Sequence, residues 1–170
     1  EIVPVAAEKV MVLEGEAGSV DRFRWAYTPG HASHHACYLD DETGIAFCGD
    51  VAGVRIGDGP TVPPTPPPDI DVEQWVASMR LVASWEPGAL AVTHFGTYTD
   101  AQEQLATLEA ELVRLAEFAR THDEAAYVAE IDRLTGDSPS YFSAMPPDTL
   151  YGGLSRYWTK KAERAEMGGT

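Results

Sequence analysis

Three short apolar segments in the first hundred residues each end at a histidine or an aspartate, and a turn or loop follows each. These segments and their ends are Phe23–Tyr27 with His31, Ile45–Cys48 with Asp50, and Ala89–Thr93 with His94. Strands of one sheet that end at the same edge bring their terminal side chains together. The pattern therefore predicts an α/β chain in which His31, Asp50 and His94 meet at one edge of a sheet.

The rest of the first half also favours short strands. Lys9–Leu13 and His35–Leu39 have strand-like sequences, and the acidic, glycine-ended segment 40–44 predicts a hairpin turn. Residues 57–69 contain too many prolines for a helix or a central strand, so they form either a linker or a rigid functional lip. Apolar periodicity then predicts a helix over residues 71–85.

The chain changes character after Thr97. Leucines recur every three or four residues over 100–121, and further helices are expected over residues 123–134 and 147–166. We therefore expect two parts. Residues 1–97 form a strand-rich domain, and residues 98–170 form a helical extension that packs on it.

Composition excludes several kinds of partner. The formal net charge is −15, whereas binding to nucleic acid or to an anionic membrane needs clustered Lys and Arg. No run of 18 apolar residues is present, so we expect no membrane span. Cys37 and Cys48 lack CxxC spacing, which favours free buried thiols, a reducing compartment and a cytoplasmic location over a disulfide.

The residue types at the three strand ends fit metal chemistry. Imidazole nitrogens and carboxylate oxygens are ligands for Zn, Fe and Mn, and one carboxylate has two oxygens with which it can bridge two ions. A strand-end histidine is also an ordinary hydrogen-bonded residue in many proteins. Spacing alone does not decide between these interpretations.

The motifs around these residues resemble three metal-binding motifs of the metallo-β-lactamase-fold hydrolases. They are Thr28-Pro29-Gly30-His31, Cys48-Gly49-Asp50 and Val92-Thr93-His94-Phe95-Gly96. The resemblance implies that His31 ligates a first metal, His94 ligates a second, and Asp50 bridges both. It also implies that His35 orients the site. His34 matches no ligand of the family, and we expect it at the rim of the site as a candidate for substrate contact.

One motif of that family is absent. The His-x-His-x-Asp-His pattern, which supplies the other four ligands, occurs nowhere in this sequence. The resemblance therefore implies the second half of an αββα sandwich followed by a C-terminal helical segment. Either the N-terminal half has been removed, or it is a second chain. By itself this half supplies one ligand to each metal plus the bridge, which is too few for tight binding.

The implied activity is that of a dinuclear metal-dependent hydrolase. Two divalent ions, zinc or else manganese or iron, would activate water against a small-molecule ester, thioester, lactone, lactam or phosphoester. Arg55 and Tyr98 are further candidates for substrate contact. Two alternatives remain open: a mononuclear-iron sulfur dioxygenase of the same fold, and a non-catalytic half-domain that needs a partner chain. An incomplete sandwich also predicts an exposed sheet edge and apolar surface, and with them a partner chain or a homo-oligomer.

Overall fold

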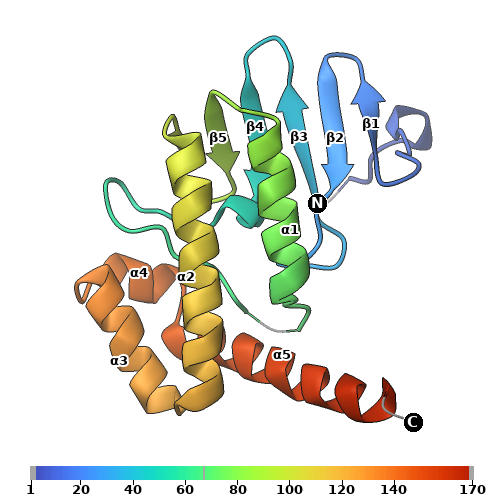
Figure 1. Cartoon of the computed structure of the whole chain (residues 1–170). Helices are drawn as coiled ribbons and strands as arrows, with labels where there is room; N and C mark the ends of the chain where they lie inside the picture. The colour runs from blue at the N-terminus through green and yellow to red at the C-terminus, as the bar shows by residue number, and fades with distance from the viewer. Residues whose placement is uncertain (1–2, 67, 169–170) are drawn as a thin grey trace.

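The predicted α/β architecture is confirmed by a computed structural model, which describes residues 3–66 and 68–168. Within those residues one six-stranded sheet has the order β1-β2-β3-β4-β5-β6, and α1 and α2 lie across one of its faces (Figure 1). The strands are β1 (Ala17–Val20), β2 (Phe23–Tyr27), β3 (Ala36–Asp40), β4 (Ile45–Gly49), β5 (Ala89–Val92) and β6 (Thr97–Tyr98). The helices are α1 (Val72–Ser84), α2 (Ala101–Thr121), α3 (Glu124–Thr135), α4 (Pro139–Ala144) and α5 (Pro147–Gly168), with short 3-10 turns η1 (Ala7–Lys9) and η2 (Asp50–Ala52).

The strand directions explain why the three candidate ligands share an edge. β2 pairs antiparallel with β3, and β3 pairs antiparallel with β4, so β2 and β4 run the same way. β4 then pairs in parallel with β5, across the connection that contains α1. The carboxyl ends of β2, β4 and β5 therefore lie at one edge of the sheet.

The two faces of the sheet differ in how they are covered. Side chains alternate along each strand, and Leu39, Ala46 and Leu90 on the helix side are almost completely buried. Tyr27 and Phe47 point to the opposite face, where they remain 40% and 44% exposed. Figure 1 draws both α1 and α2 on the same side. The described residues therefore leave aromatic side chains uncovered on the other side.

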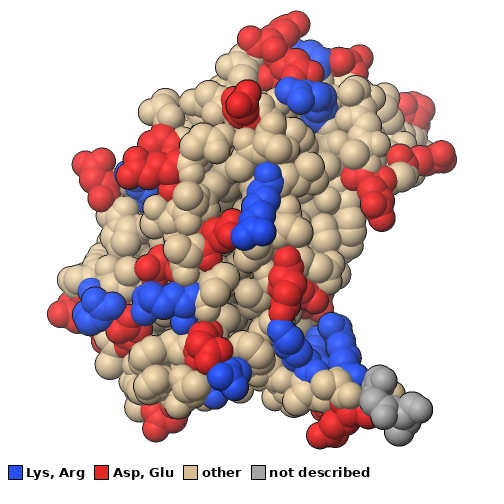
Figure 2. Space-filling view, viewed as in Figure 1, with Lys and Arg blue, Asp and Glu red and all other residues tan. Residues whose placement is uncertain are grey.

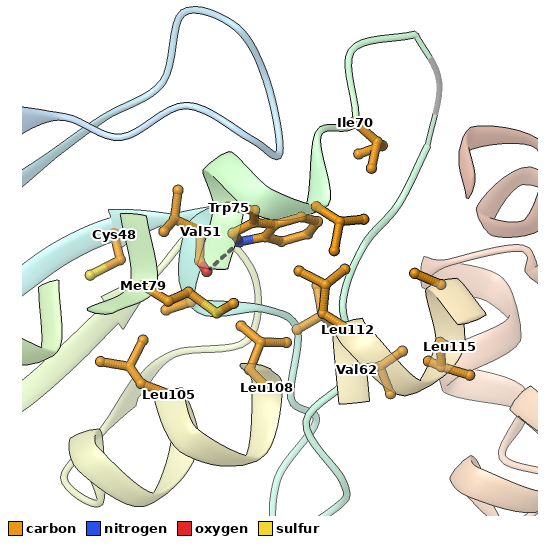
Figure 3. Close-up of a cluster of buried hydrophobic side chains, with 14 of the residues drawn as sticks. Cys48, Val51, Val62, Ile70, Trp75, Met79, Leu105, Leu108, Leu112 and Leu115 are labelled. Atoms are coloured by element: carbon orange, nitrogen blue, oxygen red, sulfur yellow. Dashed lines mark hydrogen bonds between the residues drawn. The ribbon is translucent and has the colours of Figure 1, made fainter. Parts of the chain in front are cut away.

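The core lies between the sheet and helices α1 and α2. Trp75 and Met79 of α1 pack among the leucines of α2, which recur at helical spacing as the sequence predicted (Figure 3). The indole Nε1 of Trp75 donates a hydrogen bond of 2.9 Å to the carbonyl of Val51. This contact fixes the turn that follows Asp50 against the first turn of α1.

Two details of the secondary structure differ from the sequence prediction. The strand expected over Lys9–Leu13 is wrong: within the described residues that segment pairs with no strand, and Val10 and Val12 are exposed. Alternating apolar residues form a strand only where another strand can bond to them. Residues 139–144, which lie between the helices expected over 123–134 and 147–166, form an additional short helix, α4. Pro67, inside the predicted proline-rich loop, lies outside the described residues.

The helices after α2 form a compact group. α5 contacts both α2 and α3, and the indole of Trp158 on α5 donates to the carbonyl of Ala116 on α2 at 2.7 Å. Charged side chains cover much of the surface in Figure 2, with blue side chains gathered over α5. None of the helices in the described part of the chain combines the length and apolar character needed to cross a bilayer.

Candidate metal centre

The ends of three strands bring His31, Asp50 and His94 together. His31 Nε2 lies 3.5 Å from Asp50 Oδ2, and His94 Nε2 lies 3.6 Å from Asp50 Oδ1. Each imidazole therefore approaches a different oxygen of the same carboxylate. Residues far apart in the sequence meet as their positions at strand ends predicted.

The turn before His31 depends on glycine. Gly30 has a φ of +128°, and a Cβ at this position would lie 2.2 Å from the backbone nitrogen of Trp75. A side chain is excluded both by the backbone conformation and by this close approach. The carbonyl of Gly30 also accepts the Asp71 amide at 2.8 Å, so the turn is bonded to the start of α1.

The imidazole of His31 is oriented by its other nitrogen. Nδ1 lies 2.9 Å from the carbonyl of Pro64, an arrangement that assigns the proton to Nδ1 and leaves the Nε2 lone pair facing Asp50. Burial lowers the pKa of His31 and outweighs the opposing influence of the Asp50 carboxylate. His31 is therefore a neutral nitrogen donor near pH 7.

Asp50 is held by the residues that follow it. Val51 and Ala52 are fully buried, and the side-chain Nε2 of Gln104 on α2 donates to the carbonyl of Ala52 at 3.0 Å. The side chain of His94 is less enclosed, with 54% of it exposed. The site thus has one fixed side, formed by His31 and Asp50, and one open side at His94.

The donor set fits a metal site in kind but not in number. One imidazole nitrogen and one carboxylate oxygen face each of two positions, which matches a bridging carboxylate. Among the residues that the structure describes, no group of three or more His, Cys, Asp or Glu side chains is arranged to hold a metal ion. A stable site usually needs three or four protein donors. His31, Asp50 and His94 alone therefore do not make up a complete metal site.

The other two predicted histidines lie differently. The ring of His35 is 6.1 Å from that of His31, edge to face, and lies beside Gly49. His35 is therefore close enough to support the site by packing. His34 is exposed and is not among the side chains that line the pocket described below.

Arg55 and Tyr98 interact with each other rather than with His31 or Asp50. Arg55 Nη1 donates to Asp100 Oδ2 at 2.6 Å, and the guanidinium lies 5.0 Å from the ring centroid of Tyr98. The Tyr98 hydroxyl donates to the Arg55 carbonyl. The structure thus places both predicted substrate contacts at the start of α2, outside the pocket lining.

A cavity of about 420 Å³ opens beside the three candidate ligands, and we call it the apolar pocket. One wall comes from the proline-rich segment and the strand ends: Val54, Pro64, Pro66 and Phe95. The other wall comes from the connection between α4 and α5: Ala144, Met145, Pro146, Thr149 and Leu150. The sequence prediction missed this second wall. Its only local signal was an apolar Ala-Met-Pro-Pro run between helices.

Comparison with known proteins identifies relatives of this chain. Residues 8–113 match the family model of the metallo-beta-lactamase superfamily. A curated relative, the metallo-beta-lactamase fold-containing protein ST1585 of Sulfurisphaera tokodaii, is 36% identical over 93 residues, which are 52% of this chain and 34% of that protein. The chain thus spans about a third of the length of this relative.

Solved structures extend the comparison to the fold. The metallo-beta-lactamase family protein TTHA1429 from Thermus thermophilus has a TM-score of 0.56 at 20% identity, and the match covers 91% of this chain and 49% of that one. The structure of ST1585 from Sulfolobus tokodaii has a TM-score of 0.48 at 31% identity, covering 64% and 40%. Because the family model matches well over half of its residues, the chain belongs to the metallo-β-lactamase superfamily.

Proposed function

We propose that this chain is part of a metal-dependent hydrolase in which His31, Asp50 and His94 are metal ligands. The observation that carries the proposal is the Asp50 carboxylate between two imidazoles, with one nitrogen 3.5 Å from Oδ2 and the other 3.6 Å from Oδ1. Asp50 would contact two ions, and each histidine would hold one of them; we propose that the ions are zinc, or else manganese or iron.

Each residue of the site has a separate role in the proposed reaction. When bound, divalent ions lower the pKa of water and polarise the oxygen of the bond to be cleaved. Asp50 would hold both ions through its two carboxylate oxygens. The Pro64 carbonyl keeps the Nε2 lone pair of His31 aimed at the site. The apolar pocket limits access of bulk water and positions the substrate beside Asp50.

The remaining donors come, in this proposal, from polypeptide outside this chain. Two features support this: the His-x-His-x-Asp-His pattern is absent from the sequence, and the described residues leave Tyr27 and Phe47 exposed on one face of the sheet. An N-terminal half or a separate chain that packs on this face would bring donors to the same edge. A second copy of the chain is a further candidate for covering the face.

The test compares the 170-residue chain alone with the same chain joined to the polypeptide encoded before it. We expect the extended protein to contain two Zn or Mn by elemental analysis and to hydrolyse ester or thioester probes until EDTA removes the metal. His31→Ala should abolish hydrolysis and lower the metal content. His122→Gln is the matched control, because His122 stacks on Phe118 and lies outside the pocket lining.

Other outcomes would favour other functions. One iron per protein, with oxygen consumption and no hydrolysis, would support the mononuclear-iron sulfur dioxygenase. An extended protein that neither binds metal nor hydrolyses any probe would support the non-catalytic half-domain. Hydrolysis by His31→Ala at the rate of the His122→Gln control would overturn the proposed ligand role.

A further inference from the structure

The apolar pocket contains few charged side chains, although the chain as a whole is strongly acidic. Its titratable side chains are the three candidate ligands, at one end. Beyond them the lining is aliphatic, proline or aromatic, apart from Thr149. In the described residues no Lys or Arg lines this pocket. A ligand that extends away from Asp50 therefore meets hydrocarbon.

This lining disfavours an anionic substrate. A phosphoryl or carboxylate group placed in apolar surroundings without a partner loses its hydration and gains nothing in return. Arg55, the basic residue that the sequence suggested for this task, already donates to Asp100 and does not line the pocket. The net charge of −15 adds a long-range repulsion to the same effect.

The wall between α4 and α5 is fixed in place. Thr65 Oγ1 donates to the Leu150 carbonyl at 3.0 Å, which ties the proline-rich segment to α5. The Tyr141 hydroxyl accepts from the Ile56 amide at 2.9 Å and donates to the Pro60 carbonyl at 2.6 Å. A pocket whose walls are bonded across 80 or more residues of sequence is formed before ligand arrives. It can therefore select by size and polarity.

We propose that the apolar pocket binds the uncharged aliphatic acyl group of an ester or thioester, with the carbonyl carbon at the end formed by His31, Asp50 and His94. This deepens the proposed hydrolase function and rests on it. In the reaction water adds to the carbonyl carbon and the C–O or C–S bond breaks. The alcohol or thiol leaves with a proton, and the acyl group becomes a carboxylic acid.

The first test measures binding without catalysis. N-methyl amides of butanoic to decanoic acid resemble the substrate but resist cleavage, and their affinity for the 170-residue chain can be measured by NMR titration. Each added methylene should strengthen binding about fourfold until the pocket is filled. Equal affinity along the series, or no binding at all, would overturn the proposal.

A pair of neighbouring variants locates the binding site. Ala144 and Ser143 are both exposed residues of α4, but only Ala144 lines the apolar pocket. Ala144→Glu should weaken binding of the octanoic amide about tenfold or more, because the carboxylate would be placed against the alkyl chain. Ser143→Glu adds the same charge beside it and should leave binding unchanged. Equal weakening by both variants would overturn the assignment to this pocket.

A second variant and a kinetic series complete the design. If Ala144→Glu fails to fold by circular dichroism, Thr149→Glu takes its place. On the extended protein, kcat/KM for thioesters should rise with acyl length and fall when the acyl group ends in a carboxylate. Hydrolysis without this preference would overturn the acyl proposal and leave the hydrolase function standing. Amide binding without any hydrolysis would overturn the hydrolase function and leave the pocket as a binding site for acyl groups.

Discussion

Two hollows on this molecule differ in the partners of their charged side chains. The apolar pocket holds Asp50 between two imidazoles. The second, which we call the charged hollow, has a volume of about 260 Å³ and lies between α5 and the start of α1, with Asp71, Glu73, Lys161 and Arg164 in its lining. There Lys161 pairs with Glu73, and Arg164 Nη1 lies 3.8 Å from Asp71 Oδ2.

The difference shows how to separate structural charges from chemical ones. Cations and carboxylates of the charged hollow partner one another, so they tie α5 to α1. In the apolar pocket the carboxylate faces two nitrogen atoms that are potential donors to metal, in surroundings that are otherwise mostly hydrocarbon. A titratable group in such surroundings is a stronger candidate for function than a larger number of paired charges.

The largest expected effect comes from neutralising the carboxylate of Asp50 in the apolar pocket. The same change at Asp71 in the charged hollow is the control. On the proposed function, Asp50→Asn should lower kcat/KM of the extended, metal-loaded protein by on the order of a thousandfold, because Asp50 would contact both ions. Asp71→Asn removes the same charge from the charged hollow, where the side chain caps α1 by accepting the Gln74 amide at 3.1 Å. Asparagine also caps helices well, so activity should persist.

Steady-state kinetics and metal analysis of both variants make the measurement. If Asp71→Asn lost as much activity as Asp50→Asn, the distinction between the two hollows would be wrong.

The next effect concerns the wall of the apolar pocket. A Cβ on Gly153 would lie 1.8 Å from the Thr65 carbonyl oxygen, whereas a Cβ on the adjacent Gly152 would meet nothing within 4 Å. Gly153→Ala should therefore destabilise the protein by about 2 kcal/mol, because the helix must move from the proline-rich segment. Gly152→Ala should be neutral or stabilising, since alanine favours helix.

Urea unfolding of the two alanine variants measures this difference. The octanoic amide should also bind more weakly to Gly153→Ala, because the same shift displaces Leu150. Equal stability of the two variants would mean that the wall is less tightly held than the contacts indicate.

A paired charge outside both hollows tests the structural role of such pairs. Hydrogen bonds from Arg133 and Arg114 lower the pKa of Glu130 from 4.5 to about 2, and the Arg114 contact joins α2 to α3. A lowered pKa means that the contribution is complete above pH 4.5 and is lost as the pH falls towards 2. Glu130→Gln should therefore cost about 1.5 kcal/mol near pH 7, and much less near pH 2.

Glu117→Gln provides the control for this pH series. Glu117 pairs with Arg120 at the surface, within a single helix, and its removal should change the unfolding free energy less than removal of Glu130. A difference between Glu130→Gln and the parent chain that stays constant from about pH 7 to about pH 2 would contradict the pairing.

The fold class and the meeting of the three candidate ligands were predictable because their signals are local. Leucine spacing marks α2, and the glycine turns with polar residues at strand ends mark His31 and Asp50. Their convergence followed from one further assumption, that the strands end at the same edge. The strand predicted over Lys9–Leu13 shows the opposite case, since alternation alone does not provide a partner strand.

Local sequence patterns could not predict the second wall of the pocket or the partner of Arg55. Thr65 and Leu150 are 85 positions apart, and their hydrogen bond depends on how α2 to α5 pack together. Arg55 lies in the loop that follows Asp50, as expected for a substrate contact. Its guanidinium, however, donates a hydrogen bond to Asp100, 45 positions away. Sequence patterns therefore predicted that His31, Asp50 and His94 lie together, while the apolar lining beside them required the tertiary structure.

The smallest expected effect comes from one exposed lysine of the charged hollow. Lys161 is 46% exposed and contacts Glu73, the Tyr157 hydroxyl at 2.9 Å and the ring of Trp158. Lys161→Ala should lower the unfolding free energy by only about 0.5 kcal/mol, since exposed pairs are weak and are screened by salt. Activity and amide binding should not change, because the charged hollow and the apolar pocket share no lining residue. A loss of amide affinity in Lys161→Ala, measured by the same titration, would show that the two hollows are coupled through α5.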